Sequence, residues 1–222
     1  MRYRCILYFL LVFATLSCDS RSSNSKPAQQ QASQPDTLAA DTIKKPVAKA
    51  PPKPDSSYLI VPGERIGQIR LGETAELVNS KLGQPDSGDA AMGKALNFWI
   101  NPDEKKVRQY VAVYFVRHLE KGQEALRTEQ VQVTSPAFKT SGSIGTGSNI
   151  ADIRQKYKLT PLAYYTNTKQ QQVYIYDDVA RGIAFEVTLP DSTCTAVTIH
   201  RKDENVVDTY LPLHPDMIRL KK

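Results

Sequence analysis

The sequence predicts an α+β fold in which a short strand, a helix and three antiparallel strands occur twice in tandem. Both helices are expected to pack on one face of a single antiparallel sheet. Two observations lead to this prediction. The segments 67–72 and 142–147 align with both outer glycines and one isoleucine in common. The segments that follow each of them alternate apolar and polar residues, as antiparallel strands with one solvated face do.

An amphipathic helix is predicted after each glycine turn. Thr74 and Asn149 fall on each other as helix N-caps, and Gly72 and Gly147 precede them where a tight turn leaves no room for a side chain. The apolar stripes that follow have helical spacing. Their members are Ala75, Val78 and Leu82 in the first copy and Ile150, Ile153 and Tyr157 in the second.

Three strands are predicted after each helix, around apolar segments that align between the copies. These segments are 98–100, 113–115 and 131–133 in the first copy and 173–175, 183–185 and 197–199 in the second. Side chains alternate between the faces of a sheet. One parity is therefore predicted to pack on the helices: Phe98, Ile100, Val113, Phe115, Val131 and Val133 in the first copy, with Val173, Ile175, Ile183, Phe185, Val187, Val197 and Ile199 in the second.

The opposite parity carries five aromatic residues that we interpret as a candidate protein-binding face. They are Trp99, Tyr110, Tyr114, Tyr174 and Tyr176. Exposed aromatic side chains among polar groups are typical of interaction surfaces. Aromatic residues also favour strands whichever face they point to, so a binding surface and simple strand propensity both stay open as explanations. The C-terminal tail is a candidate to cover part of this face.

The first eighteen residues are typical of a targeting segment. Arg2 and Arg4 precede an apolar run from Cys5 to Leu16, which is too short to span a membrane comfortably. Its end, Thr-Leu-Ser-Cys at 15–18, resembles the lipobox of bacterial lipoproteins, with Thr15 where leucine is usual. The resemblance implies a signal peptide over residues 1–17 and a lipid anchor on Cys18. An ordinary signal peptide with an unmodified Cys18 is the alternative.

The predicted organisation after the leader is a linker and two repeats. Residues 18–57 are rich in Ser, Gln, Ala, Pro and Lys without an aromatic residue, a composition that cannot bury enough surface to fold. Repeat one is expected over 58–138, repeat two over 139–210, and a C-terminal tail over 211–222. The sequence therefore predicts an exported chain with a lipid anchor, in the outer membrane rather than the inner one.

The order of elements resembles two families. The G-x-I-x-x-G turn, the amphipathic helix and the step Leu82-Gly83-Gln84-Pro85 resemble the SmpA/OmlA domain of envelope lipoproteins. Two such units over residues 63–200 resemble the β-lactamase inhibitor protein (BLIP) fold. The second copy departs from the SmpA/OmlA pattern at Lys158, where the first copy has Gly83. The chain also lacks a cysteine pair for the disulfides of the BLIP family. The resemblance implies a protein-binding or assembly-scaffold role without catalysis, and it names no target.

Composition disfavours several other classes of function. Residues 1–57 hold 8 Lys/Arg against 4 Asp/Glu, and residues 58–222 hold 21 against 19. The folded part is therefore nearly neutral, which disfavours a nucleic-acid binder. The three cysteines and three histidines have no metal-ligand spacing. We expect no metal, no small-molecule cofactor and no enzymatic activity, and a protein partner of unknown identity.

Two alternative functions stay open at this point. An envelope hydrolase would need Cys194, His200 and a carboxylate within hydrogen-bond reach of one another. A periplasmic inhibitor of a secreted enzyme would need a concave sheet with loops such as 137–141 projecting from its rim.

Overall fold

The computed structural model describes residues 55–102, 108–119, 122, 124–206 and 214–221, all within the unit Ala50–Lys222. The leader, Cys18 and the linker up to residue 54 lie outside the described residues, so their assignments stay predictions. The described part begins with Asp55, whose side chain accepts a hydrogen bond of 2.9 Å from the Ser57 amide and caps the short 3-10 helix Ser56–Tyr58.

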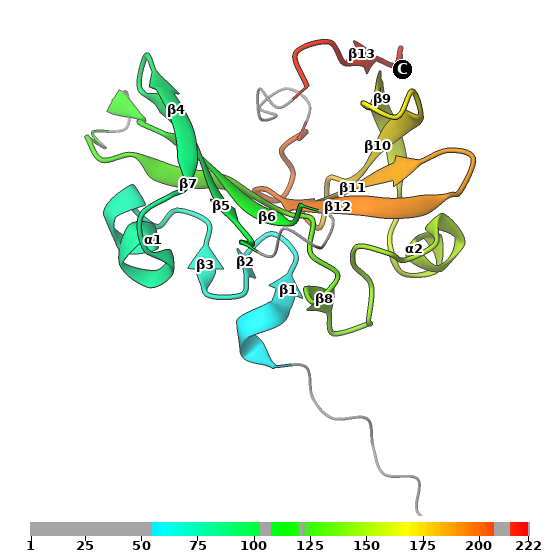
Figure 1. The fold of residues 1–222 in the computed structure, drawn as a ribbon, viewed down its shortest axis with the longest axis horizontal. Coiled ribbons are helices and arrows are strands. Elements are labelled where there is room, and N and C mark those ends of the chain that lie inside the picture. Colours follow the sequence, from blue (N-terminus) through cyan, green and yellow to red (C-terminus); the bar gives the residue numbers. More distant parts are fainter. Residues whose placement is uncertain (1–54, 103–107, 120–121, 123, 207–213, 222) are drawn as a thin grey trace, which may run out of the picture. The chain divides into compact units, whose positions relative to one another are not determined.

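Nine strands of the described residues form a sheet that we call the large sheet (Figure 1). Their order is β13-β9-β10-β11-β12-β7-β6-β5-β4, and every neighbouring pair is antiparallel. The bounds are β4 Ser87–Ala91, β5 Lys94–Ile100, β6 Tyr110–Val116, β7 Arg127–Val133, β9 Thr160–Thr166, β10 Gln172–Asp178, β11 Ile183–Thr188, β12 Thr193–Ile199 and β13 Ile218–Arg219. The six predicted strand segments lie in β5, β6, β7, β10, β11 and β12, which confirms them.

The two copies meet at the centre of the large sheet. There β7 pairs with β12, with Gln132 opposite Thr198. The strands β4 to β7 therefore form one half of the sheet, and β9 to β12 form the other. The outermost strands of the two halves are β4 and β9, and β9 is in turn covered by β13.

Four short strands form a second, small sheet in the order β3-β2-β1-β8 within the described residues. Their bounds are β1 Leu59–Val61, β2 Arg65–Ile66, β3 Ile69–Arg70 and β8 Lys139–Thr140. The pairing of β1 with β8 is parallel, with Leu59 opposite Lys139. The small sheet therefore joins the start of the first copy to the start of the second.

The predicted fold class is wrong. The described chain is mostly β, with two sheets, and its helices α1 (Ala75–Leu82) and α2 (Ile150–Lys156) are short. The prediction placed the short strand before each helix in a single sheet. Instead, β3 pairs with β2 and β8 pairs with β1 in the small sheet, where the almost completely buried Ile60, Ile66 and Ile69 form a separate apolar face.

The predicted starts of both helices are confirmed. The Thr74 hydroxyl accepts a hydrogen bond of 3.3 Å from the Leu77 amide, and the Asn149 side chain accepts one of 2.9 Å from the Ala151 amide. Gly72 and Gly147 have φ angles of 81° and 88°, a region that favours glycine. Both turns therefore favour glycine for its backbone conformation, and space is not the reason, because a Cβ at either position would meet no atom within 4 Å.

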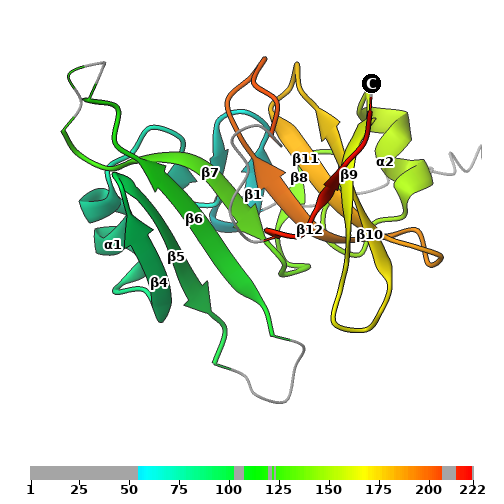
Figure 2. The ribbon, with the colours of Figure 1, turned by 90° about the horizontal axis from the view of Figure 1, so that it is seen from above.

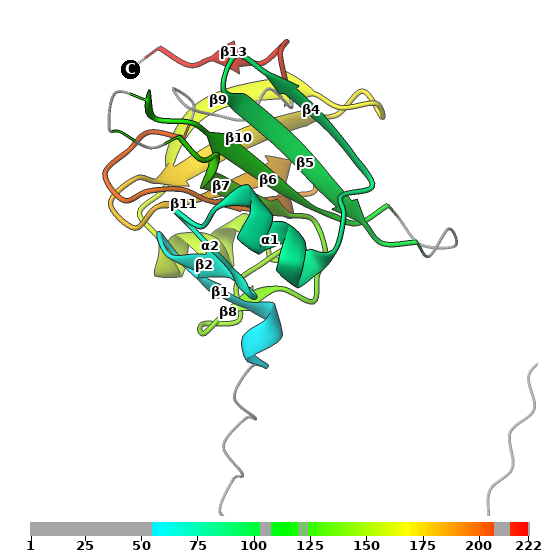
Figure 3. The same cartoon turned by 90° about the vertical axis from the view of Figure 1, so that its left-hand side faces the viewer.

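The main core lies between the large sheet and a layer made of α1, α2 and the small sheet, which share one side of it (Figure 3). Each helix contributes one completely buried side chain, Val78 and Ile153 respectively. They belong to the same apolar cluster as Phe115 and Phe185 of the large sheet, which are also completely buried.

Candidate interaction surface

The side of the large sheet away from the helices, here called the open face, is concave. Its outer strands β4 and β9 rise on the same side (Figure 1), and Figure 2 looks onto this face. A second apolar cluster lies there. Its buried members are Leu96, Ala112, Tyr114, Leu162, Ala163, Ile175, Ala184 and Val206. The large sheet therefore buries apolar side chains on both of its faces.

A groove of about 600 Å³ lies beside the hairpin of β4 and β5. Its lining residues are Asp89, Ala91, Met92, Lys94, Ala95, Leu96 and Tyr114. Asp89 is opposite Leu96 in the ladder, and Leu96 is opposite Tyr114, so these three side chains form a row across β4, β5 and β6. Met92, at the hairpin tip, is 99% exposed. An apolar hollow with a few polar groups at its rim is typical of a binding site.

A polar network occupies the middle of the open face. The Gln132 amide donates a hydrogen bond of 2.9 Å to the Glu186 carboxylate and lies 3.2 Å from the Thr198 hydroxyl. The hydroxyl of Tyr165 donates to the other oxygen of Glu186 (2.7 Å), and the hydroxyl of Tyr110 donates to Gln132 (3.0 Å). The network joins both halves of the sheet, and its hydrogen bonds offset the cost of burying Glu186.

The two tyrosines of this network are held in their protonated form. Burial, together with the nearby negative charge of Glu186, raises the pKa of Tyr110 and of Tyr165 above the ordinary range. Both hydroxyls therefore remain hydrogen-bond donors, and neither serves as a base at neutral pH.

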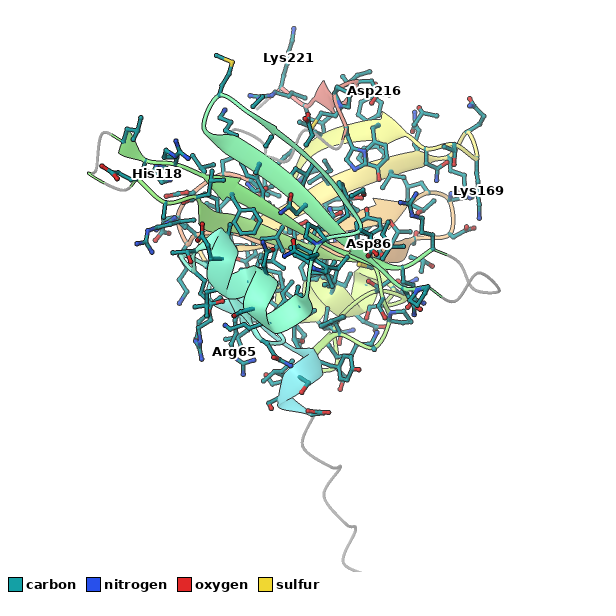
Figure 4. The ribbon with its side chains drawn as sticks, turned by 60° about the vertical axis from the view of Figure 1, so that its left-hand side comes forward. Arg65, Asp86, His118, Lys169, Asp216 and Lys221 are labelled. Carbon is teal, nitrogen blue, oxygen red and sulfur yellow. The ribbon has the colours of Figure 1, made fainter. Side chains whose placement is uncertain are left out.

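The C-terminal segment covers the β9 side of the open face. β13 pairs with β9, with Ile218 opposite Tyr164, and the Leu220 amide donates a hydrogen bond of 2.8 Å to Leu162. The His214 ring stacks on Tyr165 at 3.6 Å between centroids, and its Nε2 atom lies 3.4 Å from Glu186. Figure 4 shows Asp216 and Lys221 in this same segment. Part of the proposed binding face is thus covered by the chain itself.

The five aromatic residues predicted to form one binding face lie on two faces. Tyr110 and Tyr114 lie on the open face, whereas Trp99, Tyr174 and Tyr176 pack with the cluster on the helix side. The parity predicted for the strand segments 113–115, 131–133, 183–185 and 197–199 is correct. The parity predicted for β5 and β10 is inverted, because both faces of the sheet bury apolar residues and the more apolar side of a strand does not identify the helix side.

Two of these three residues, Trp99 and Tyr176, connect the sheet to the helices, and Tyr174 stacks on a tyrosine of the neighbouring strand. The Trp99 indole donates a hydrogen bond of 3.0 Å to the carbonyl oxygen of Gly83, directly after α1. The guanidinium of Arg154 in α2 lies 5.5 Å from the centre of the Tyr176 ring, and Tyr174 stacks on Tyr164 at 5.4 Å. These contacts give Trp99, Tyr174 and Tyr176 a packing role on the side that the helices cover.

Of the residues considered for a hydrolase, His200 meets a carboxylate, but Cys194 lies apart from both. His200 is buried, with Nε2 2.9 Å from Asp177 and Nδ1 2.8 Å from the Arg201 carbonyl. Cys194 lies at the other end of β12, and its thiol donates to the Ala196 carbonyl. Burial and the charge of Glu186 raise the pKa of Cys194 to about 12, which keeps the thiol protonated and unreactive.

A further charged cluster, which the sequence did not indicate, lies where β7 and β12 approach each other. Glu129 accepts two hydrogen bonds of 2.9 Å from Arg201, and its carboxylate lies 2.8 Å from Nε2 of His118. Figure 4 labels His118. Burial alone would raise the pKa of Glu129, but the hydrogen bonds and charges of Arg201 and His118 outweigh it and lower the pKa.

Within the residues that the structure describes, no group of three or more His, Cys, Asp or Glu side chains is arranged to hold a metal ion. None of the helices found in this same part of the chain is long and apolar enough to cross a membrane.

Comparison with known proteins gives one distant structural likeness. No family model and no curated protein matches the sequence. The fold is similar to the crystal structure of an extracellular protein containing an SCP domain from Bacillus anthracis strain Ames, with 15% sequence identity and a TM-score of 0.42. The match covers 81% of this chain and 54% of that one, so the chain spans about half the length of that protein. The SmpA/OmlA and BLIP resemblances stay predictions.

Proposed function

We propose that the chain is an exported lipoprotein of the bacterial cell envelope, anchored through Cys18, whose folded unit binds a protein partner on the open face without catalysing a reaction. The lipobox-like leader supports export and anchoring. At about 3.3–3.6 Å per residue, the linker is long enough to hold the folded unit well clear of a membrane. We place the anchor in the outer membrane.

The groove beside β4 is the observation that carries the binding proposal. Its floor is formed by Leu96 and Tyr114, and Met92 stands almost fully exposed at its rim. A large apolar side chain in water, next to an apolar hollow, is a feature that interaction sites share. His200 and Cys194 lie apart in buried structural contacts, and no observation favours the hydrolase.

A photo-crosslinking amino acid placed at Met92 tests this function in cells that express the full chain. The matched control carries the same amino acid at Leu119, another exposed apolar residue (66%) that does not line the groove. We expect a defined protein adduct from position 92 and none from position 119. The same adducts from both positions, or none from position 92, would contradict the proposal. A secreted enzyme as the adduct would identify the inhibitor alternative.

A further inference from the structure

β4 is an edge strand with few of the features that usually protect an edge. In the described part of the chain it pairs only with β5, and all five residues of Ser87–Ala91 are exposed. Natural edges are commonly protected by proline, lysine or a bulge. β4 has neither residue, its register with β5 is continuous, and Asp89 is its single charged residue. Its remaining side chains are small, so another backbone can approach closely.

The opposite edge of the same sheet already carries an added strand. There β13 pairs with β9, so that Arg219 lies opposite Ala163 and the Leu220 amide bonds to Leu162. This added segment, Met217 to Leu220, combines apolar residues with one basic residue. β4 and β9 hold equivalent places in the two halves of the sheet, and the described residues cover only β9.

The groove defines what a strand on β4 would contact. Asp89 and Ala91 project on the open face, as their pairing with Leu96 and Lys94 shows. Alternate side chains of an added strand would project on this face beside them. A basic side chain beside Asp89 would form a favourable cross-strand pair, whereas a second copy of β4 would bring like charges together. Charge therefore favours a basic, apolar segment over self-pairing.

We propose that the free edge of β4 is the docking site for an extended segment of the partner protein, which adds as a further strand with Lys or Arg beside Asp89 and apolar side chains toward the groove. This inference rests on the proposed binding function and specifies how the partner is held. In this mode backbone hydrogen bonds supply affinity, and alternate side chains supply specificity.

The probe for this proposal is a fluorescent synthetic peptide with the sequence of residues 214–222, which contains the strand that adds to β9. Its binding to the full mature chain with Cys18→Ser is measured by fluorescence anisotropy at physiological ionic strength. We expect Asp89→Lys to raise the Kd at least tenfold. Asp191→Lys, at the exposed turn between β11 and β12, is the matched control and should leave the Kd unchanged. A peptide carrying R219E should regain binding to the Asp89→Lys chain.

Backbone methylation separates strand addition from simple charge attraction. Two further peptides carry N-methyl groups on alternate amides, in the two opposite phases. Strand addition uses the amides of one side only, so one peptide should lose binding and the other should retain it. No binding of the parent peptide, equal binding to Asp89→Lys, or equal binding of both methylated peptides would overturn the proposal. Crosslinking from Met92 would still show separately whether the binding function stands.

Discussion

Single residues decide where charge is buried in this protein, and Glu129 is the clearest case. Its carboxylate is held by a bidentate contact with Arg201 and by His118, which lower its pKa. His118 lies 11 positions from Glu129 and Arg201 lies 72 positions from it, beyond the reach of a helix or turn pattern, so no local pattern predicts the cluster. By contrast, the helix caps Thr74 and Asn149 depend on residues two or three positions away, and the sequence therefore predicted them.

The lowered pKa of Glu129 predicts a specific acid sensitivity. A folded-state pKa below the unfolded value of about 4.3 contributes stability that is fully present above that value. This contribution is lost as the pH falls through the folded pKa. Glu129→Gln should therefore be less stable than wild type at pH 7, and the difference should shrink below about pH 4.3.

Urea unfolding across this pH range checks the prediction. The exposed Glu124 provides the control, because Glu124→Gln should follow the wild-type pH profile. A difference between Glu129→Gln and wild type that stays constant down to pH 2 would show that the ion pair does not contribute in this way.

At the scale of elements, the positions of six strands of the large sheet were predictable, but β4, β9 and β13 were not, and neither were the faces of β5 and β10. In β5, Phe98 faces the open side and Trp99 faces the helices, although Phe98 belongs to the more apolar parity. The alternation of apolar and polar residues identifies the core side of a strand only when the other side is exposed to solvent. Here the C-terminal segment and the second apolar cluster bury part of that other side. Strands as short as β2 and β3 show too little alternation to indicate a small sheet.

The equivalent phenylalanines of β6 and β11 test the core directly. Phe115 and Phe185 are both completely buried on the helix side. Each change to alanine should lower the free energy of unfolding by about 3–5 kcal/mol, as truncation of a buried aromatic residue does. Leu119→Ala, at an exposed position, should change it by less than about 0.5 kcal/mol. Denaturant unfolding measures all three, and a loss below about 1 kcal/mol for either phenylalanine would place it outside the core.

At the scale of the whole molecule, the chain combines a folded unit with an N-terminal part that the sequence alone describes. Only the sequence indicates the anchor, since residues 1–54 lie outside the described structure. The internal repeat predicted two equivalent halves, and the pairing of β7 with β12 joins them. It did not predict that β13 covers the outer strand of one half only, because that contact joins segments more than fifty residues apart.

The anchor gives a prediction for the intact chain. Mass spectrometry of the mature protein should find an acylated Cys18 at its N-terminus, because the lipobox-like motif ends there. Cys18→Ser should abolish acylation, because serine has no thiol to carry an acyl chain, and a chain that is still cleaved at this position should then leave the membrane fraction. A Cys18→Ser chain that is cleaved normally and remains fully in the membrane fraction would contradict lipid anchoring.

The affinity for the crosslinked partner tests the central claim, binding through the open face, most directly. Purified mature chains are compared by titration with that partner. Met92→Asp places a charge at the rim of the groove and should raise the Kd at least tenfold, whereas Leu119→Asp should leave it within twofold, about 0.4 kcal/mol. Equal affinities of wild type and Met92→Asp, with both variants folded, would contradict the assignment of the open face as the binding surface.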